Sequence, residues 1–199
     1  MPPPNRRADI MVMPDLVRRY TVRDLESFPN DGKKYELIRG ELIVSPAPSV
    51  IHEIVVRRLA WRLGQYLEPL GLLEALFPVP ADISWDDETL VQPDMLVIRL
   101  EELTRRWSTI KNLRLAVEVI SPSSRRRDRL DKRLLYQENR VETHWVVDVE
   151  AELIEEWHPG DERPLIVADT LRWRVTPEAP LLEIELASLF RDLPPEAAP

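Results

Sequence analysis

The sequence predicts a mixed α/β domain, and three features support this class. Two apolar runs, residues 95–98 and 113–120, have the composition of strands buried in the middle of a sheet. From Ser49 to about Leu67, apolar residues recur at helical spacing, so one face of a helix should pack on that sheet. A chain of 199 residues with 44% hydrophobic content can bury one sizeable core, and we expect a single domain.

Before the long helix, local signals predict a short helix and a hairpin. Thr21 and Asp24 have the spacing of residues that open a helix. Residues 35–38 and 41–45 should form a hairpin around the turn at Arg39 and Gly40.

After that helix, strands are expected near residues 72–84. Residues 101–107 should form a short helix or loop between the two central strands, and a helix should follow the second of them. Residues 143–149 and 153–158 predict two paired strands. Residues 163–190 should add an edge strand and a short terminal helix.

The ends of the chain differ in composition from its middle. Residues 1–19 are polar and proline-rich, as is the tail 191–199, and both are expected to be poorly ordered around a domain spanning residues 20–190. No run is long and apolar enough to span a membrane, and the start lacks the apolar core of a secretory signal, so a cytoplasmic protein is expected.

Composition excludes several kinds of site. The chain has no cysteine, which rules out disulfides, iron–sulfur clusters and thiolate zinc sites, and its three histidines lack ligand spacing. A net charge of -8 predicts weak non-specific attraction to DNA.

Two acidic residues carry most of the functional information. Asp94 lies at the mouth of the first apolar strand, and Glu118 lies inside the second. Burying a carboxylate among apolar residues costs several kcal/mol unless it meets a cation, a metal or hydrogen-bond donors, so a positive group should lie beside Glu118. Adjacent strands can bring both carboxylates to one point, and an oxygen-only set of ligands suits Mg²⁺.

These residues resemble a known signature. Pro93-Asp94 followed by Glu118-Val119-Ile120 is similar to the metal-binding motif of the PD-(D/E)XK nuclease superfamily, which normally has lysine where this chain has Ile120. More narrowly, the chain from about residue 20 to residue 160 resembles the Uma-type family of restriction-endonuclease-like proteins. The segments that carry this resemblance are residues 35–42, 45–48, 52, 92–94, 118–124 and 145–148.

The resemblance implies a restriction-endonuclease-like core of order αβββαβ, in which a mixed central sheet is flanked by helices. It also implies hydrolysis of DNA phosphodiester bonds with Mg²⁺, for which Mn²⁺ can substitute. A homodimer is expected because the family that the chain resembles typically forms one. Asp94 and Glu118 would be the metal ligands. Lys132, on the helix after the glutamate strand, would replace the missing lysine, with Leu135 and Tyr136 as apolar neighbours that let it lean inward. The alternative is a solvated lysine on a charged helix.

Two further residues are expected to support the site by the same resemblance. Glu36 lies in the first strand and His52 near the start of the long helix. Glu36 also fits an outward-facing strand glutamate, and His52 fits a hydrogen-bonded structural histidine.

The basic run Arg125, Arg126 and Arg127 could hold backbone phosphates without reading sequence. The leading hypothesis is therefore a metal-dependent endonuclease. The alternatives are a catalytically silent nucleic-acid or protein-binding module with the same fold, which Ile120 and the acidic balance favour, and a purely structural ion site.

Overall fold

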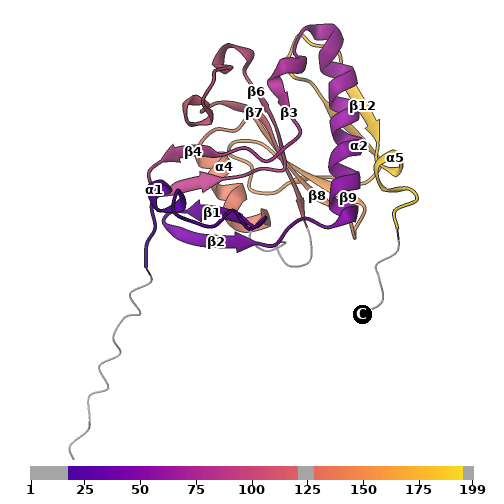
Figure 1. Cartoon of the computed structure of the whole chain (residues 1–199). Helices are drawn as coiled ribbons and strands as arrows, with labels where there is room; N and C mark the ends of the chain where they lie inside the picture. Colours follow the sequence, from indigo (N-terminus) through magenta and orange to yellow (C-terminus); the bar gives the residue numbers. More distant parts are fainter. Residues whose placement is uncertain (1–17, 121–127, 195–199) are drawn as a thin grey trace, which may run out of the picture.

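The computed structural model describes residues 18–120 and 128–194, and their side chains except those of residues 128 and 129. Its largest sheet has six strands in the order β10-β9-β8-β7-β6-β3, and a second sheet has the order β2-β1-β5-β4. A third, two-stranded sheet pairs β11 with β12. Figure 1 shows α2 running along the large sheet, with α4 and the β1–β2 hairpin lying together away from most of that helix. The prediction of a mixed α/β class is confirmed.

The strands of the described residues are β1 (Lys34–Ile38), β2 (Glu41–Ser45), β3 (Leu76–Phe77), β4 (Ile83–Asp86), β5 (Thr89–Val91), β6 (Met95–Ile98), β7 (Leu113–Ile120), β8 (Thr143–Asp148), β9 (Leu153–Trp157), β10 (Leu165–Val167), β11 (Thr170–Trp173) and β12 (Leu182–Glu185). The α-helices are α1 (Val22–Leu25), α2 (Val50–Leu67), α4 (Arg133–Glu138) and α5 (Ala187–Phe190). Shorter turns are the 3₁₀ segments η1 (Glu68–Leu70), η2 (Leu73–Ala75), η3 (Leu100–Glu102) and η4 (Trp107–Thr109), and the π-helical η5 (Asp128–Lys132). None of these helices has the length and apolar content needed to cross a bilayer.

The centre of the large sheet is the pair β7 and β8, which run parallel. Parallel neighbours need a crossover connection, and here η5 and α4 lie in the connection between the two strands. β6 lies antiparallel on the other side of β7, and β9 antiparallel on the other side of β8. Because β6, β7 and β8 are covered on both faces, they consist almost entirely of buried residues, as their continuous apolar runs predicted.

The β1–β2 hairpin turns at Arg39 and Gly40, both of which have positive φ (52° and 79°). Two residues of positive φ form the tight turn whose twist matches that of the flanking strands, and glycine adopts this conformation at little cost. β1 also pairs with β5, so the hairpin belongs to the second sheet. Alternation along β1 turns Lys34 and Glu36 to the same side.

Three expectations need correction. Residues 72–84 do not simply form strands, because η2 precedes the two-residue β3 and β4 begins only at Ile83. The three-residue β5 was not expected at all. Residues 163–190 hold three strands and α5 rather than a single edge strand and a helix.

The long helix begins and packs as its sequence predicts. Ser49 is the N-cap, and its side chain accepts a hydrogen bond from the backbone N–H of His52 at 3.2 Å. One face of α2 is buried against the large sheet, and α2 contacts both β3 and β7. The buried positions of this face are Val55, Val56, Leu59, Leu63 and Leu67.

Truncation of this face should destabilise the domain. Leu59 is 0% exposed, so Leu59→Ala removes apolar contacts and leaves a cavity, at a cost of about 2–5 kcal/mol in the free energy of unfolding. Trp61→Ala, on the same helix at 67% exposure, is the control and should change that free energy by less than about 1 kcal/mol. Urea denaturation of both variants measures the difference, and similar losses would contradict the burial of this helix face.

Candidate functional site

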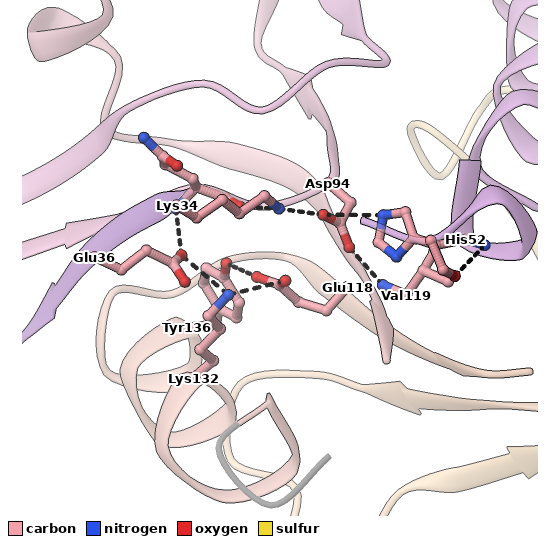
Figure 2. Close-up of polar contacts among 10 residues, drawn as sticks. Lys34, Glu36, His52, Asp94, Glu118, Val119, Lys132 and Tyr136 are labelled. Carbon is pink, nitrogen blue, oxygen red and sulfur yellow. Dashed lines mark hydrogen bonds and ion pairs between the residues drawn. The ribbon is translucent and has the colours of Figure 1, made fainter. Parts of the chain in front are cut away.

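A cluster of charged side chains lies where the six-stranded sheet and the four-stranded sheet meet the crossover segment, which consists of η5 and α4. Figure 2 shows Asp94 and Glu118 pointing toward a shared region with Lys34, Glu36 and Lys132. His52 lies at one end of the cluster, and Tyr136 lies within it beside Glu118 and Lys132. The structure therefore brings together the five site residues that the sequence predicted within the described part of the chain, and adds Lys34 and Tyr136.

Glu118 is buried on β7 and has the positive partner that its position required. Its Oε2 lies 3.0 Å from the ammonium of Lys132, and its Oε1 accepts a hydrogen bond of 2.6 Å from the hydroxyl of Tyr136. These two contacts compensate for the removal of the carboxylate from water. Burial first, and then the charge of Glu118, raise the pKa of Tyr136 well above its ordinary value, so the phenol keeps the proton that it donates.

Lys132 leans into the protein, and the alternative of a solvated lysine is wrong. Its side chain is 4% exposed, and its ammonium lies 3.0 Å from both Glu118 Oε2 and Glu36 Oε1. It ends the π-helical segment η5, and Tyr136 follows one turn later in α4. Single π-turns of this kind often occur at functional sites. The crossover segment thus supplies two groups that contact the same glutamate.

Glu36 is buried on β1 rather than facing outward, so that alternative is also wrong. Its Oε1 accepts a hydrogen bond of 2.6 Å from the backbone N–H of Gln92 and contacts Lys132. The residue therefore ties β1 both to the segment that leads into Asp94 and to the crossover helix.

Asp94 connects β6 to β7 through its backbone N–H and one carboxylate oxygen, and its other oxygen faces the side chains of Lys34 and His52. Its backbone N–H donates to the carbonyl of Val117, and its Oδ2 accepts from the backbone N–H of Val119 at 2.8 Å. Its Oδ1 contacts the ammonium of Lys34 and lies 3.4 Å from Nε2 of His52. Burial raises the pKa of Asp94, but the His52 hydrogen bond and the Lys34 charge outweigh it and hold that pKa below its usual range.

His52 reaches the site because the Ser49 cap places it in the first turn of α2. Its contact with Asp94 is compatible with the predicted supporting role, and also with a histidine that only holds Asp94 in place. In both cases His52 contacts Asp94 and therefore lies beside the acidic pair.

Sequence reasoning missed Lys34 and the role of Tyr136, although both have a readable signal. Lys34 precedes Glu36 by two residues, the spacing that puts two strand residues on one face. Its ammonium contacts Asp94 and lies 3.3 Å from the carbonyl of Gln92. Burial works against its charged form, yet the charges of Asp94 and Glu118 prevail and raise the pKa of Lys34. Tyr136 follows Lys132 by four residues, the helical spacing that joins side chains on one face.

The donor set fits a hard divalent cation with few protein ligands. Asp94 and Glu118 offer carboxylate oxygens, each with lone pairs beyond those that accept the bonds above, and Mg²⁺ takes much of its shell from water and substrate. Among the residues that the structure describes, no group of three His, Cys, Asp or Glu side chains has the arrangement of a metal site. Asp94 and Glu118 would hold the cation, and Lys34 already contacts the Oδ1 atom of Asp94.

The basic run Arg125, Arg126 and Arg127 lies outside the described residues. Its predicted role in phosphate binding stays a prediction.

Comparisons with known proteins identify the family of the chain. The family model described as "Putative restriction endonuclease", Uma2, matches residues 22–188. The match covers most of the chain, and the protein therefore belongs to this family, as the sequence resemblance implied. No curated protein matches the chain.

Among solved structures, the chain is similar to a protein of Anabaena variabilis that is described as a putative nuclease belonging to DUF820. The two share 15% sequence identity with a TM-score of 0.70, and the similarity covers 85% of this chain and 97% of the other. At this identity the likeness concerns the fold alone, and it agrees with the mixed α/β class.

Removal of the Tyr136 hydroxyl tests the buried network. Tyr136→Phe deletes one hydrogen bond to the buried Glu118 and should lower the free energy of unfolding by about 1–3 kcal/mol. Tyr35→Phe, whose hydroxyl bonds to the exposed Asp31, is the matched control and should cost less than about 1 kcal/mol. Denaturant titrations of the two variants measure these losses in the free energy of unfolding, and equal losses would argue against the network.

His144 should make the domain sensitive to mild acid. The imidazole is buried and packs 4.6 Å from the ring of Tyr136, and its nitrogens lack a hydrogen-bond partner among the described residues. Burial, with a contribution from the charge of Lys132, lowers the pKa of His144 from 6.5 to about 3. Between pH 6.5 and about pH 3 the unfolded chain binds a proton at His144 that the folded protein does not bind. The contribution of His144 to the free energy of unfolding is therefore fully present above pH 6.5 and falls as the pH decreases.

Between pH 6.5 and about pH 5 this linkage should remove roughly 1–2 kcal/mol of stability from the wild type, and His144→Leu should abolish that loss. His158→Gln is the control, because a hydrogen bond with Glu156 raises the pKa of His158 to about 9. The stability that His158 contributes to the folded protein is fully present below pH 6.5 and is lost only as the pH rises through about 9. An unchanged acid slope in His144→Leu would refute the assignment.

Proposed function

We propose that this protein is a divalent-metal-dependent endonuclease that hydrolyses phosphodiester bonds of DNA. The observation that carries the proposal is the convergence of Asp94, Glu118 and Lys132, in which a buried ammonium lies 3.0 Å from the glutamate. Membership of a restriction-endonuclease family supports the same reaction class.

The protein's residues divide the work of such a reaction. Asp94 and Glu118 would hold Mg²⁺, with Mn²⁺ as the substitute. When bound, the cation would act as a Lewis acid on the phosphodiester and make a water molecule more acidic. Lys132 would orient the attacking water or neutralise the charge that develops on the phosphoryl oxygens. Water forms the new P–O bond and releases its proton, while the opposite P–O bond breaks and its oxygen takes up a proton.

The surrounding contacts favour a pre-organised site. Glu36 and Glu118 together fix the ammonium of Lys132, with 3.0 Å to each, and Tyr136 fixes the second oxygen of Glu118. A charge that is already in place needs little reorganisation when the transition state forms, which is the main source of electrostatic catalysis. These pre-organised charges support an active enzyme. Because the same network also joins the two sheets, a DNA cleavage assay is the measurement that separates the enzyme from a silent binding module.

Cleavage of supercoiled plasmid and of single-stranded DNA tests the proposal, with Mg²⁺, Mn²⁺ or a chelator present. The wild type should nick or cut DNA only with metal. Asp94→Ala, Glu118→Ala and Lys132→Ala should each lose at least about 100-fold in rate, because each removes a metal ligand or the charge beside it.

Two controls separate chemistry from folding and from general charge. Asp87→Ala and Lys33→Ala change exposed residues of the same types outside the cluster and should retain wild-type cleavage. Circular dichroism should show that every variant is folded. Metal-independent cleavage, or full activity in folded Asp94→Ala, would overturn the proposal. DNA retardation without any cleavage would indicate the binding module instead.

A further inference from the structure

The two lysines of the site differ in how they are enclosed. Lys132 has a side chain that is 4% exposed and contacts two carboxylates. Lys34 has a side chain that is 17% exposed and contacts Asp94 and a backbone carbonyl. Lys34 therefore lies toward the open side of the cluster, and its flexible four-carbon stem can move without disturbing β1.

The contact that Lys34 makes involves the oxygen that a metal would need. Oδ2 of Asp94 accepts the backbone N–H of Val119, so Oδ1 is the oxygen that faces the cluster. The ammonium of Lys34 lies against this oxygen. A divalent cation that binds Oδ1 would meet a like charge within a few ångströms, and that repulsion is strong in a partly buried site.

The charges of the cluster indicate where Lys34 would go. A divalent cation at Oδ1 of Asp94 would neutralise the carboxylate that Lys34 neutralises in its absence. The displaced ammonium would then need another anionic partner, and the phosphate of a bound substrate would supply one beside the cation.

We propose that Lys34 is an exchangeable counter-ion, which neutralises Asp94 before metal binds and contacts the substrate phosphate after metal displaces it. The inference rests on the proposed function, because it assigns the partner that Lys34 takes during that reaction. The alternative is a fixed ion pair that only holds Asp94 in place. The two possibilities differ in what a bound metal does to Lys34. In an exchange, metal and Lys34 compete for Asp94, whereas in a fixed ion pair Lys34 stays in contact with Asp94 when metal binds.

Isothermal titration with Mn²⁺ measures the competition. Lys34→Met keeps the apolar stem and removes the charge, and it should bind Mn²⁺ at least fivefold more tightly than the wild type. Lys34→Arg keeps the charge and should stay within twofold of the wild type. Lys33→Met is the matched control, because the neighbouring Lys33 is exposed and bonds to Asp31, and its affinity should not change.

Amine acylation of the wild-type protein, read by mass spectrometry at each lysine, follows the movement itself and does not depend on the folding of a variant. Mn²⁺ should increase the acylation rate of Lys34 at least threefold and leave that of Lys132 unchanged. With metal saturating, Lys34→Met should also raise the KM for DNA.

The outcomes separate this inference from the proposed function. The exchange is overturned if Lys34→Met binds metal with equal or lower affinity than the wild type. It is also overturned if metal binds to the wild type without changing the acylation of Lys34. Either outcome leaves the nuclease proposal intact. An unchanged KM overturns the phosphate contact. Binding of Mn²⁺ by neither the wild type nor Lys34→Met overturns the metal site and the exchange together. Binding by Lys34→Met alone supports the exchange.

Discussion

The structure depends on one buried ion network, in which the ammonium of Lys132 lies between Glu118 and Glu36 at 3.0 Å from each. Removing such ions from water costs several kcal/mol each, which is offset only when geometry and additional hydrogen bonds are good. The network joins β7 of the large sheet, β1 of the second sheet and the crossover segment η5. The network thus favours this docking of the three elements, because an arrangement that separates Lys132 from either carboxylate leaves a buried charge without that partner.

Ile120 stands where the nuclease motif that this chain resembles has lysine, and the network places an ammonium beside Glu118 from a different element. Ile120 is buried beside Val146 and Trp157, so its position on β7 belongs to a small apolar cluster. Lys132 reaches the carboxylate from the helix instead. Electrostatic interaction depends on where the charge lies and not on which element carries it. The strand position could thus become apolar without loss of the ammonium from the cluster.

The sequence predicted what strong local patterns determine. The buried strands of Asp94 and Glu118, the Ser49 helix and the hairpin at Gly40 follow from apolar runs, spacing and turn residues. The three-residue β5 was missed because so short a strand carries no clear alternation. Residues 163–190 were expected to add one edge strand, whereas the structure has β10, β11 and β12 there. The contacts of Lys34 and His52 with Asp94 depend on how β1 and α2 dock, which no local pattern encodes.

Asp94 illustrates why such a site needs the whole fold. Its Oδ2 accepts the backbone N–H of Val119, the residue that follows Glu118, so the bond fixes the direction of Oδ1 relative to that glutamate. Tyr136 and Lys132 fix the two oxygens of Glu118 from the other side. Each carboxylate is thus oriented by contacts from a different part of the chain. Under the proposed function, a hard cation would depend on this orientation, which comes from the backbone of β7 and the crossover segment rather than from a dense set of acidic ligands.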